Sequence, residues 1–365
     1  MTTPLLPGST TLATGQIQTV LGPIEPETAG FTLTHEHLLC SLVPYAQAPG
    51  TATEAEWVDK PITAERLGWI QRRKYFNREV LKLHDEEVAL AEALTLAHAG
   101  GGTVVDVTSR GIGRDALGLA RISRASGLNI VMGASYYVPP AHPAGTAAKS
   151  DEQLYEETLA DVTTGVGDTG VKAGVIGEIG IIAPIDDLQT RILQAAVAVS
   201  SVTGCPISIH PPLDDAGALD IMRILLDAGA DPTNIIMGHL GMAMVDPSAL
   251  GELAATGCYL QYDHFGSFED STFQYQGREA LAQNDDERIA TLGYLIELGA
   301  GDRLLAAQDV CIQVHLRAYG GKGYDHLITN IVPRMRRRGF PQTAIDKIFV
   351  SNPARALAFK APKTI

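Results

Sequence analysis

The feature that constrains the fold most is a regular alternation of short β-rich runs with longer helical segments. Segments with helical spacing, the clearest at 85–100, 187–204, 217–230 and 285–300, lie between the β-rich runs. Eight runs bounded by glycine or proline are predicted strands, at 31–38, 103–108, 128–136, 173–180, 206–212, 234–241, 258–266 and 303–310. Strand followed by helix eight times predicts an α/β fold, the (β/α)8 or TIM barrel.

A doubly wound open sheet is the alternative that also alternates strands with helices. It needs a glycine-rich phosphate loop after its first strand, and THEHLLCSL contains none. We expect one barrel domain over 1–365, with an N-terminal extension of about 1–30 packed on it. The stretch 39–84 is interpreted as a long first βα loop with some helix.

Composition limits the kinds of partner. The chain carries 42 acidic and 28 basic residues, a formal net charge of -14, which argues against nucleic acid and anionic membranes. No run of about 18 apolar residues occurs, and the N-terminus lacks the pattern of a signal peptide. We therefore expect a cytoplasmic protein that acts on a small molecule. We also expect it to be a homodimer. The four cysteines are far apart and are expected to be buried thiols.

Two histidines, His35 and His37, stand two positions apart in the first predicted strand, FTLTHEHLLC. Alternate residues of a strand share a face, so both imidazoles point one way and Glu36 points the other. Two neutral imidazoles on one face are half of a metal site. The alternative is a pair of ordinary polar residues at a strand end.

Polar side chains at the ends of later strands favour the metal interpretation. In a barrel enzyme the active-site residues lie at the C-terminal ends of the strands. The apolar barrel interior offers polar side chains few hydrogen-bond partners, so polar residues at these ends need another role. The residues at these ends are Glu178, His210, His239, Asp263, His264 and Asp309. With His35 and His37, five histidines and three carboxylates at one rim indicate a metal centre.

The order of these residues and the sequences around them resemble a known family. The resembling stretches are TLTHEHL, DVTSRGIGRD, KAGVIGEIG, IHPP, GHLG, AQDV and GGKGYDHLITNIVPRMRRRG. They are similar to the phosphotriesterase branch of the amidohydrolase superfamily, over nearly the whole chain. The resemblance implies two divalent ions, one held by His35, His37 and Asp309 and the other by His210 and His239, with Glu178 and a hydroxide bridging them.

Zinc is the expected metal, and manganese, cobalt or iron are alternatives. The chain departs from the best-known members at the bridging residue. Those members carry a carboxylated lysine where Gly177 stands here, and Glu178 follows it. Lys172 lies roughly 20 Å down the strand and cannot substitute. The alternative is that Glu178 only supports a site with one metal.

The chemistry implied is hydrolysis of an ester-like bond by the bridging hydroxide, in a phosphotriester, carboxylic ester, lactone or amide. Asp309 would act as general base and His264 as proton relay, with Asp263 orienting His264. For His264 the alternative is a solvent-facing loop residue. The rival function is a metal-containing small-molecule binding protein without turnover.

Substrate contacts are predicted from loop position. Tyr136 and Tyr137 follow the third strand, and Phe265 and Phe268 follow the seventh, so they could line an aromatic pocket or pin the loop as a hydrophobic cluster. Arg317, in the last loop, is a candidate for a negative substrate group. Beside the second strand, Arg114 and the adjacent Asp115 are interpreted as a structural ion pair.

Overall fold

The computed structural model describes residues 14–243, 246–267, 272–275 and 278–363. Eight strands form one sheet in the order β14-β11-β10-β9-β8-β7-β6-β3. All neighbouring strands in this sheet run parallel. The strands are β3 (Phe31–Glu36), β6 (Gly101–Asp106), β7 (Asn129–Ala134), β8 (Val175–Gly180), β9 (Ile207–His210), β10 (Ile235–Met237), β11 (Tyr259–Tyr262) and β14 (Leu304–Ala306).

Backbone hydrogen bonds close the sheet by joining its first strand to the segment after its last. Asp309 N donates to His35 O (3.1 Å), and His37 N donates to Val310 O (3.2 Å). The predicted (β/α)8 barrel is therefore confirmed, and its seam lies beside the two predicted metal-binding histidines of β3.

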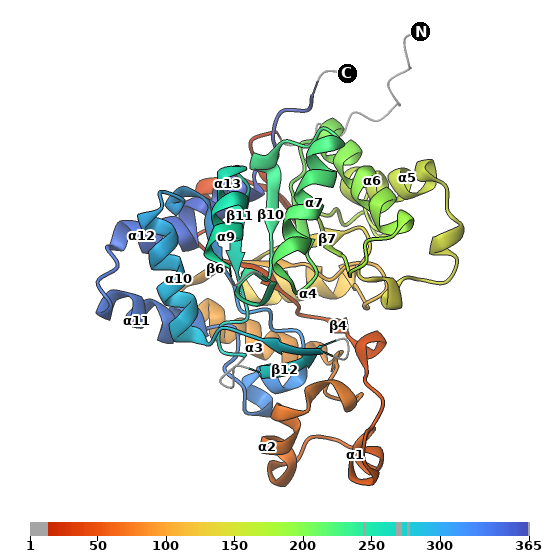
Figure 1. Cartoon of the computed structure of the whole chain (residues 1–365), viewed down its shortest axis with the longest axis vertical. Coiled ribbons are helices and arrows are strands. Elements are labelled where there is room, and N and C mark those ends of the chain that lie inside the picture. The colour runs from red at the N-terminus through yellow and green to blue at the C-terminus, as the bar shows by residue number, and fades with distance from the viewer. Residues whose placement is uncertain (1–13, 244–245, 268–271, 276–277, 364–365) are drawn as a thin grey trace.

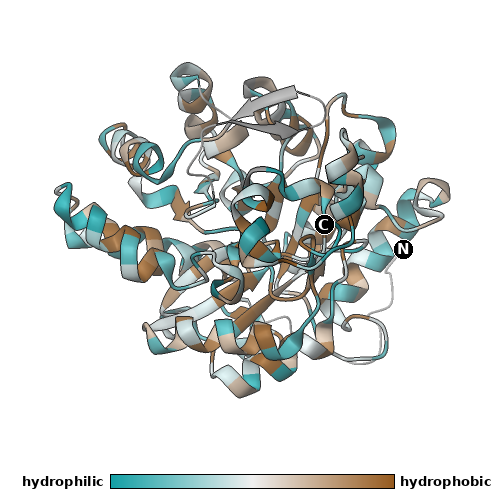
Figure 2. Ribbon diagram, turned by 90° about the horizontal axis from the view of Figure 1, so that it is seen from below, coloured by the Kyte–Doolittle hydropathy of each residue, from teal (hydrophilic) through white to brown (hydrophobic). Residues whose placement is uncertain are grey.

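The strands are apolar on both faces, as parallel strands inside a helical layer must be. Val104 and Val105 point to opposite faces of β6, and both are buried; the same holds for Ile130 and Val131 of β7. One face fills the barrel and the other packs under the helices. The strands therefore form the centre of the core, which appears brown behind the mixed helices in Figure 2.

Helices surround the barrel (Figure 1). Most begin at an acidic or hydroxyl residue whose side chain accepts a hydrogen bond from the first turn, as Asp115 does from Gly118 N and Ser150 from Gln153 N. The longer helices are α3 (Glu86–His98), α4 (Ala116–Ser126), α5 (Asp151–Thr163), α6 (Asp187–Thr203), α7 (Asp215–Asp227), α9 (Pro247–Ala255) and α10 (Asp285–Glu297). Shorter ones are α8 (Leu240–Ala243), α11 (Val332–Arg337), α12 (Gln342–Asp346) and α13 (Asn352–Leu357).

The described part of the N-terminal extension packs on the barrel. It forms a small hairpin of β1 (Ile17–Thr19) and β2 (Gly22–Ile24). Val20 N donates to Ile130 O (2.8 Å), which ties the hairpin to β7.

The segment 39–84 is the predicted long first loop with some helix. It contains α1 (Ala52–Trp57) and α2 (Ala64–Arg72), and a short ladder of β4 (Cys40–Ser41) with β5 (Lys82–Leu83). Together with the hairpin of β12 (Thr272–Tyr275) and β13 (Arg278–Leu281), it lies beyond the C-terminal ends of the barrel strands (Figure 1).

Three predicted strands were four residues too long at their C-terminal ends. The run 234–241 is a strand only to Met237, the run 258–266 only to Tyr262, and the run 303–310 only to Ala306. The chain leaves the sheet because His239, His264 and Asp309 have φ values of 55°, 62° and 47°, in the left-handed region that a strand cannot accommodate. All three residues belong to the predicted site.

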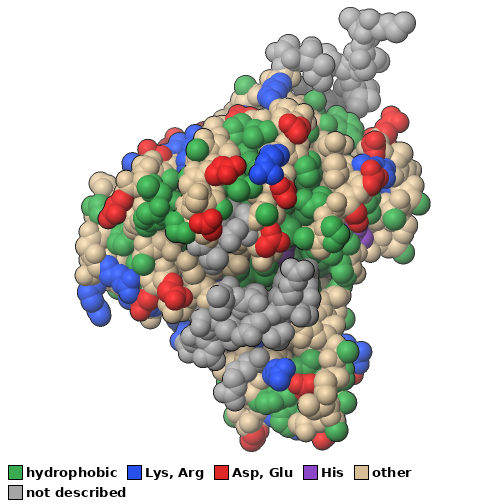
Figure 3. Space-filling model, in the orientation of Figure 1, with side chains coloured by type: hydrophobic (Ala, Val, Ile, Leu, Met, Phe, Trp, Pro, Cys, Tyr) green, Lys and Arg blue, Asp and Glu red, His purple; other side chains and the backbone are tan. Residues whose placement is uncertain are grey.

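No helix in the described ranges is long and apolar enough to cross a membrane. On the face shown in Figure 3, Lys and Arg side chains are interspersed with Asp and Glu. The four cysteines are free and buried, as expected.

Candidate metal centre

Glu178, on β8, lies at the centre of four imidazoles. Its Oε2 atom is 3.0 Å from His210 Nδ1 and 3.3 Å from both His35 Nε2 and His239 Nε2. Its Oε1 atom is 3.2 Å from His37 Nε2. Strands far apart in the sequence thus bring one carboxylate against all four predicted histidine ligands.

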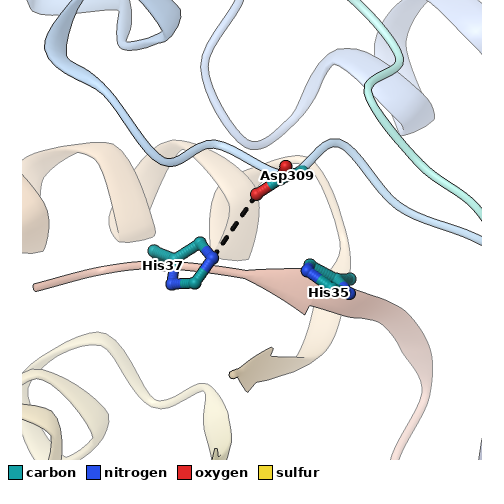
Figure 4. A group of neighbouring side chains, drawn as sticks. All are labelled: His35, His37 and Asp309. Carbon is teal, nitrogen blue, oxygen red and sulfur yellow. Dashed lines mark ion pairs between the residues drawn. The ribbon is translucent and has the colours of Figure 1, made fainter. Parts of the chain in front are cut away.

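Asp309, which follows β14, completes this set beside the two histidines of β3. In Figure 4, His35 and His37 extend from β3, and Asp309 comes from the segment after β14. Asp309 Oδ1 is 3.4 Å from His37 Nε2. Ligand atoms of His35, His37 and Asp309 lie within 4.8 Å of one another, and the same is true of His35, Glu178 and His239.

The chemistry of these atoms fits divalent metal ions. Within the described ranges, four buried polar atoms of the centre have no hydrogen-bond partner: His35 Nε2, His210 Nε2, Glu178 Oε1 and Asp309 Oδ1. Leaving such atoms buried without a partner costs several kcal/mol, roughly 1–3 for each. Imidazole nitrogens and carboxylate oxygens are the ligands that zinc and similar ions take, so two ions would satisfy the whole set.

The histidines hold the Glu178 carboxyl in its ionised form. Burial alone would raise its pKa, but the charge of His35 and hydrogen bonds from His210 and His239 outweigh burial and hold the pKa well below its usual range. Glu178 therefore presents two charged oxygens, as a bridging ligand must.

The shape of β8 explains why the glutamate stands one residue later than the family's lysine. Gly177 has φ of 136°, and a Cβ added to it would lie 2.1 Å from Ser208 O on the neighbouring strand. No side chain fits at that position. The carboxylate must therefore come from Glu178.

Three residues of the site have backbone conformations that non-glycine residues rarely adopt. The φ values are 55° for His239, 62° for His264 and 47° for Asp309. Each such conformation costs about 1–3 kcal/mol and concentrates at functional sites. These bends turn the polar side chains at the C-terminal end of the barrel inward.

The second nitrogen of each histidine of β3 has a neighbour that fixes the ring. His37 Nδ1 is 2.8 Å from Thr108 Oγ1, and His35 Nδ1 is 2.8 Å from Gln261 Nε2. Sequence reasoning did not identify Thr108 or Gln261. Gln261 stands two residues before Asp263 on the same face of β11, which was the available signal.

Asp263 orients a different histidine from the one predicted. Its carboxylate accepts hydrogen bonds from His239 N and from His239 Nδ1, both at 2.9 Å. The nearest nitrogen of His264 is 3.7 Å away, beyond hydrogen-bond distance. Asp263 therefore fixes the His239 ring. The two residues lie close together because they follow β11 and β10, which are neighbouring strands.

His264 lies directly beside Asp309. His264 Nδ1 is 3.2 Å from Asp309 Oδ2, and His264 is 4% exposed, so it is not a solvent-facing loop residue. Burial lowers the pKa of His264 to about 3, although the charges of Asp309 and Asp263 oppose this shift. The ring is therefore neutral and adjacent to the carboxylate from which it would receive a proton.

Glu36, on the other face of β3 from the two histidines, supports Asp309. Its two carboxylate oxygens accept hydrogen bonds from Gln308 N (2.7 Å) and Val310 N (2.8 Å). These are the peptide groups on either side of Asp309. No role was predicted for Glu36 from the sequence.

The predicted substrate residues lie in different surroundings. Tyr137 stands at the centre, with its hydroxyl 3.5 Å from His210 Nδ1. Tyr136 instead bonds to Glu157, and its hydroxyl also accepts from Lys149 Nζ at 3.1 Å. Tyr137 is thus the aromatic residue that faces the candidate ligands.

The predicted substrate residues in the loops are Phe265, Phe268 and Arg317, and the structure gives contacts for two of them. Phe265 is 1% exposed, with its ring centre 5.8 Å from the guanidinium carbon of Arg288. Arg317 Nη2 donates to Asp325 Oδ2 at 2.6 Å. Phe268 lies outside the described residues.

The predicted pairing of Arg114 with Asp115 was wrong. Arg114 Nη1 is 2.9 Å from Asp161 Oδ2, on α5. Asp115 is occupied instead as the N-cap of α4, where its side chain accepts from Gly118 N. A cap residue directs its carboxylate toward its own helix, and adjacent residues on an extended segment point apart.

Comparisons with known proteins agree with this geometry. The model of the phosphotriesterase family matches residues 15–357. The N-acetyltaurine hydrolase of Homo sapiens is 39% identical over 349 residues, which cover 95% of this chain and 99% of that protein.

Two solved structures are also similar. A resiniferatoxin-binding protein from Rhodobacter sphaeroides matches with a TM-score of 0.90 and 31% identity, over 95% of this chain and 96% of that chain. A lactonase from Listeria monocytogenes matches with a TM-score of 0.77 and 25% identity, over 95% of this chain and 100% of that chain.

Proposed function

The chain belongs to the phosphotriesterase family, and from this premise we propose that it is a metal-dependent hydrolase that cleaves the amide bond of N-acyl compounds such as N-acetyltaurine. The observation that carries the proposal is the buried Glu178 carboxylate among four histidines, next to Asp309. The choice of an amide rests on 39% identity to the human N-acetyltaurine hydrolase over 95% of the chain.

The centre would hold two divalent ions, with zinc as the proposed metal. His35, His37 and Asp309 would hold one ion, His210 and His239 the other, and Glu178 would bridge them. Two such ions lower the pKa of a shared water and polarise the carbonyl oxygen that the water attacks.

The proton path uses two residues of the chain. Asp309 Oδ2 would accept the proton of the attacking water and pass it to His264 Nδ1, which lies 3.2 Å away. His264, neutral and buried, would then release the proton toward the departing amine. This step matters most for an amide, because an amine must be protonated to leave.

The chain would position the substrate at the centre with Tyr137. The hydroxyl of Tyr137 lies 3.5 Å from His210 Nδ1, so it can donate a hydrogen bond to a carbonyl bound beside that histidine. The ring also packs edge-on against Tyr45, with the ring centres 5.6 Å apart. Tyr45 belongs to the long first loop, which thereby forms one wall of the site.

A second candidate function is small-molecule binding without turnover. It is favoured by the similarity to the resiniferatoxin-binding protein, at a TM-score of 0.90. A receptor needs neither a proton acceptor nor a relay, yet Asp309 and His264 are held in contact here. We therefore place hydrolysis first.

Purified protein loaded with zinc tests the proposal. It is incubated with N-acetyltaurine, an N-acetyl amino acid, a lactone, an aryl ester and a phosphotriester, and product release is followed by chromatography. We expect acetate and taurine from the first substrate at the highest kcat/KM. Metal-loaded protein that binds these compounds but hydrolyses none would favour the receptor function.

A further inference from the structure

We propose that Lys74 anchors a negatively charged group of the substrate, so that the enzyme selects N-acyl compounds that carry a sulfonate or a carboxylate. The inference rests on the proposed function and names the substrate class of the same site. Nothing in the sequence distinguished Lys74 from other basic residues of the long first loop.

Lys74 begins a short 3-10 helix, Lys74–Phe76, that follows α2. Its Nζ atom donates to Ser267 O at 2.7 Å and lies 3.2 Å from His315 Nε2. Three segments beyond the C-terminal ends of the strands meet at this ammonium group: the first loop, the loop after β11 and the loop after β14. A lysine that joins three loops at this end of a barrel lies where substrates enter.

The same loops carry the two residues of the proton path. Ser267 follows His264 by three positions, and its backbone N donates to His264 O at 3.1 Å. His315 is 8% exposed and follows Asp309 in the last loop. The charge of Asp309 is close enough to affect the pKa of Lys74. The ammonium group therefore lies on the Asp309 and His264 side of the metal centre.

The partners of Lys74 named above are neutral acceptors, a carbonyl oxygen and an imidazole nitrogen. A charged oxygen accepts a hydrogen bond from an ammonium group about twice as strongly as a neutral one. Burial, aided by Arg288, lowers the pKa of Lys74 to about 8, so most of the amine is protonated at pH 7. A sulfonate or carboxylate that entered this position would gain an ionic contact with the ammonium group.

The anchor defines how a short N-acyl compound would lie in the site. In N-acetyltaurine, four bonds separate the amide carbon from the sulfur, a reach of about 5 Å. The amide can then lie at the metal ligands while the sulfonate points toward the loops. Arg317, the residue first expected to bind a negative group, is engaged by Asp325 at 2.6 Å.

Two substrates of the same shape separate charge from size. One is N-acetyltaurine, and the other is its neutral methyl sulfone, N-[2-(methylsulfonyl)ethyl]acetamide. Steady-state kinetics on both are measured for the zinc-loaded natural protein and for Lys74→Met and Lys74→Arg. The matched control is Lys82→Met, because Lys82 lies in the same loop but pairs with Glu79 at 2.6 Å.

We expect Lys74→Met to raise KM for N-acetyltaurine about 10- to 100-fold, the usual effect of losing a hydrogen bond to a charged group. Its kcat and its kinetics on the sulfone should stay near those of the natural protein. Lys74→Arg should restore most of the loss, and Lys82→Met should change nothing. Equal loss on both substrates, or no loss on either, would overturn the anchor.

Binding measurements separate this inference from the proposed function. If the protein hydrolyses neither compound, the proposed function fails, and calorimetric titration of the zinc-loaded protein with N-acetyltaurine decides the anchor by itself. Weaker binding to Lys74→Met than to the natural protein would support it, and equal affinity would overturn it. If Lys74→Met does not fold, Lys74→Gln is compared in the same way.

Discussion

Glu36 holds both peptide groups that flank Asp309, so a residue that faces away from the metal centre fixes the position of the proposed general base. One carboxylate oxygen accepts from Gln308 N at 2.7 Å and the other from Val310 N at 2.8 Å. Asp309 itself has a φ value of 47°. The clamp maintains a backbone conformation that would otherwise relax.

Replacing Glu36 with Gln tests this clamp. An amide can accept from only one of the two peptide groups and faces the other with its own N–H, so a buried donor loses its partner, at a cost of about 1–3 kcal/mol. We expect lower thermal stability, roughly tenfold slower turnover and retained metal, because His35 and His37 are unchanged. Glu79→Gln, at a partly buried ion pair away from the metal centre, is the control. Unchanged kcat in Glu36→Gln would mean that the clamp has no part in catalysis.

Asp263 should control metal affinity through His239. Asn at position 263 can accept from either the backbone or the ring of His239, but its amide cannot serve both as the carboxylate does. We expect about 10- to 100-fold weaker metal binding, measured by competition with a chelator of known affinity. Asp231→Asn, whose carboxylate pairs with Lys360 at 2.9 Å, is the matched control. Normal metal affinity with slower turnover would instead place Asp263 in the proton path.

Much of the fold could be predicted from local patterns. The alternation of apolar runs and helical segments predicts the barrel, because parallel strands covered by helices must be apolar on both faces. The ends of β10, β11 and β14 could not be predicted, since the left-handed bends at His239, His264 and Asp309 occur at non-glycine residues and have no signature in the local sequence.

The site was predictable where residue type and strand position coincide. His35, His37 and Glu178 could be predicted because a polar residue in an apolar strand needs a hydrogen-bond partner or a bound ligand. Their partners Thr108 and Gln261 were not predicted, and neither was Lys74, because all three are placed by contacts between segments far apart in the sequence. Apart from the spacing of Gln261 and Asp263, such contacts leave no local pattern. The same cause hid the role of Asp263, whose nearest neighbour in sequence, His264, is not the histidine it binds.

Asp309 and His264 should differ in how much turnover depends on them. Asp309→Asn keeps the shape and one oxygen ligand but removes the proton acceptor, so we expect kcat to fall about 10²- to 10⁴-fold while metal content falls little. His264→Ala should be milder for aryl esters, whose leaving groups need no proton, and more severe for amides. These rates are measured on zinc-loaded variants with an aryl ester and N-acetyltaurine. Near-normal kcat in Asp309→Asn would show that another group takes the proton.

The metal content of the natural protein and of Glu178→Gln tests the central claim most directly. Apo protein is titrated with zinc, and bound metal per chain is determined by elemental analysis alongside amide and ester hydrolysis. We predict two ions per natural chain, with activity that requires both, and joint loss of metal and activity in Glu178→Gln, because an amide cannot supply two charged bridging oxygens. One ion per fully active natural chain, or two ions with full activity in Glu178→Gln, would contradict a two-metal centre bridged by Glu178.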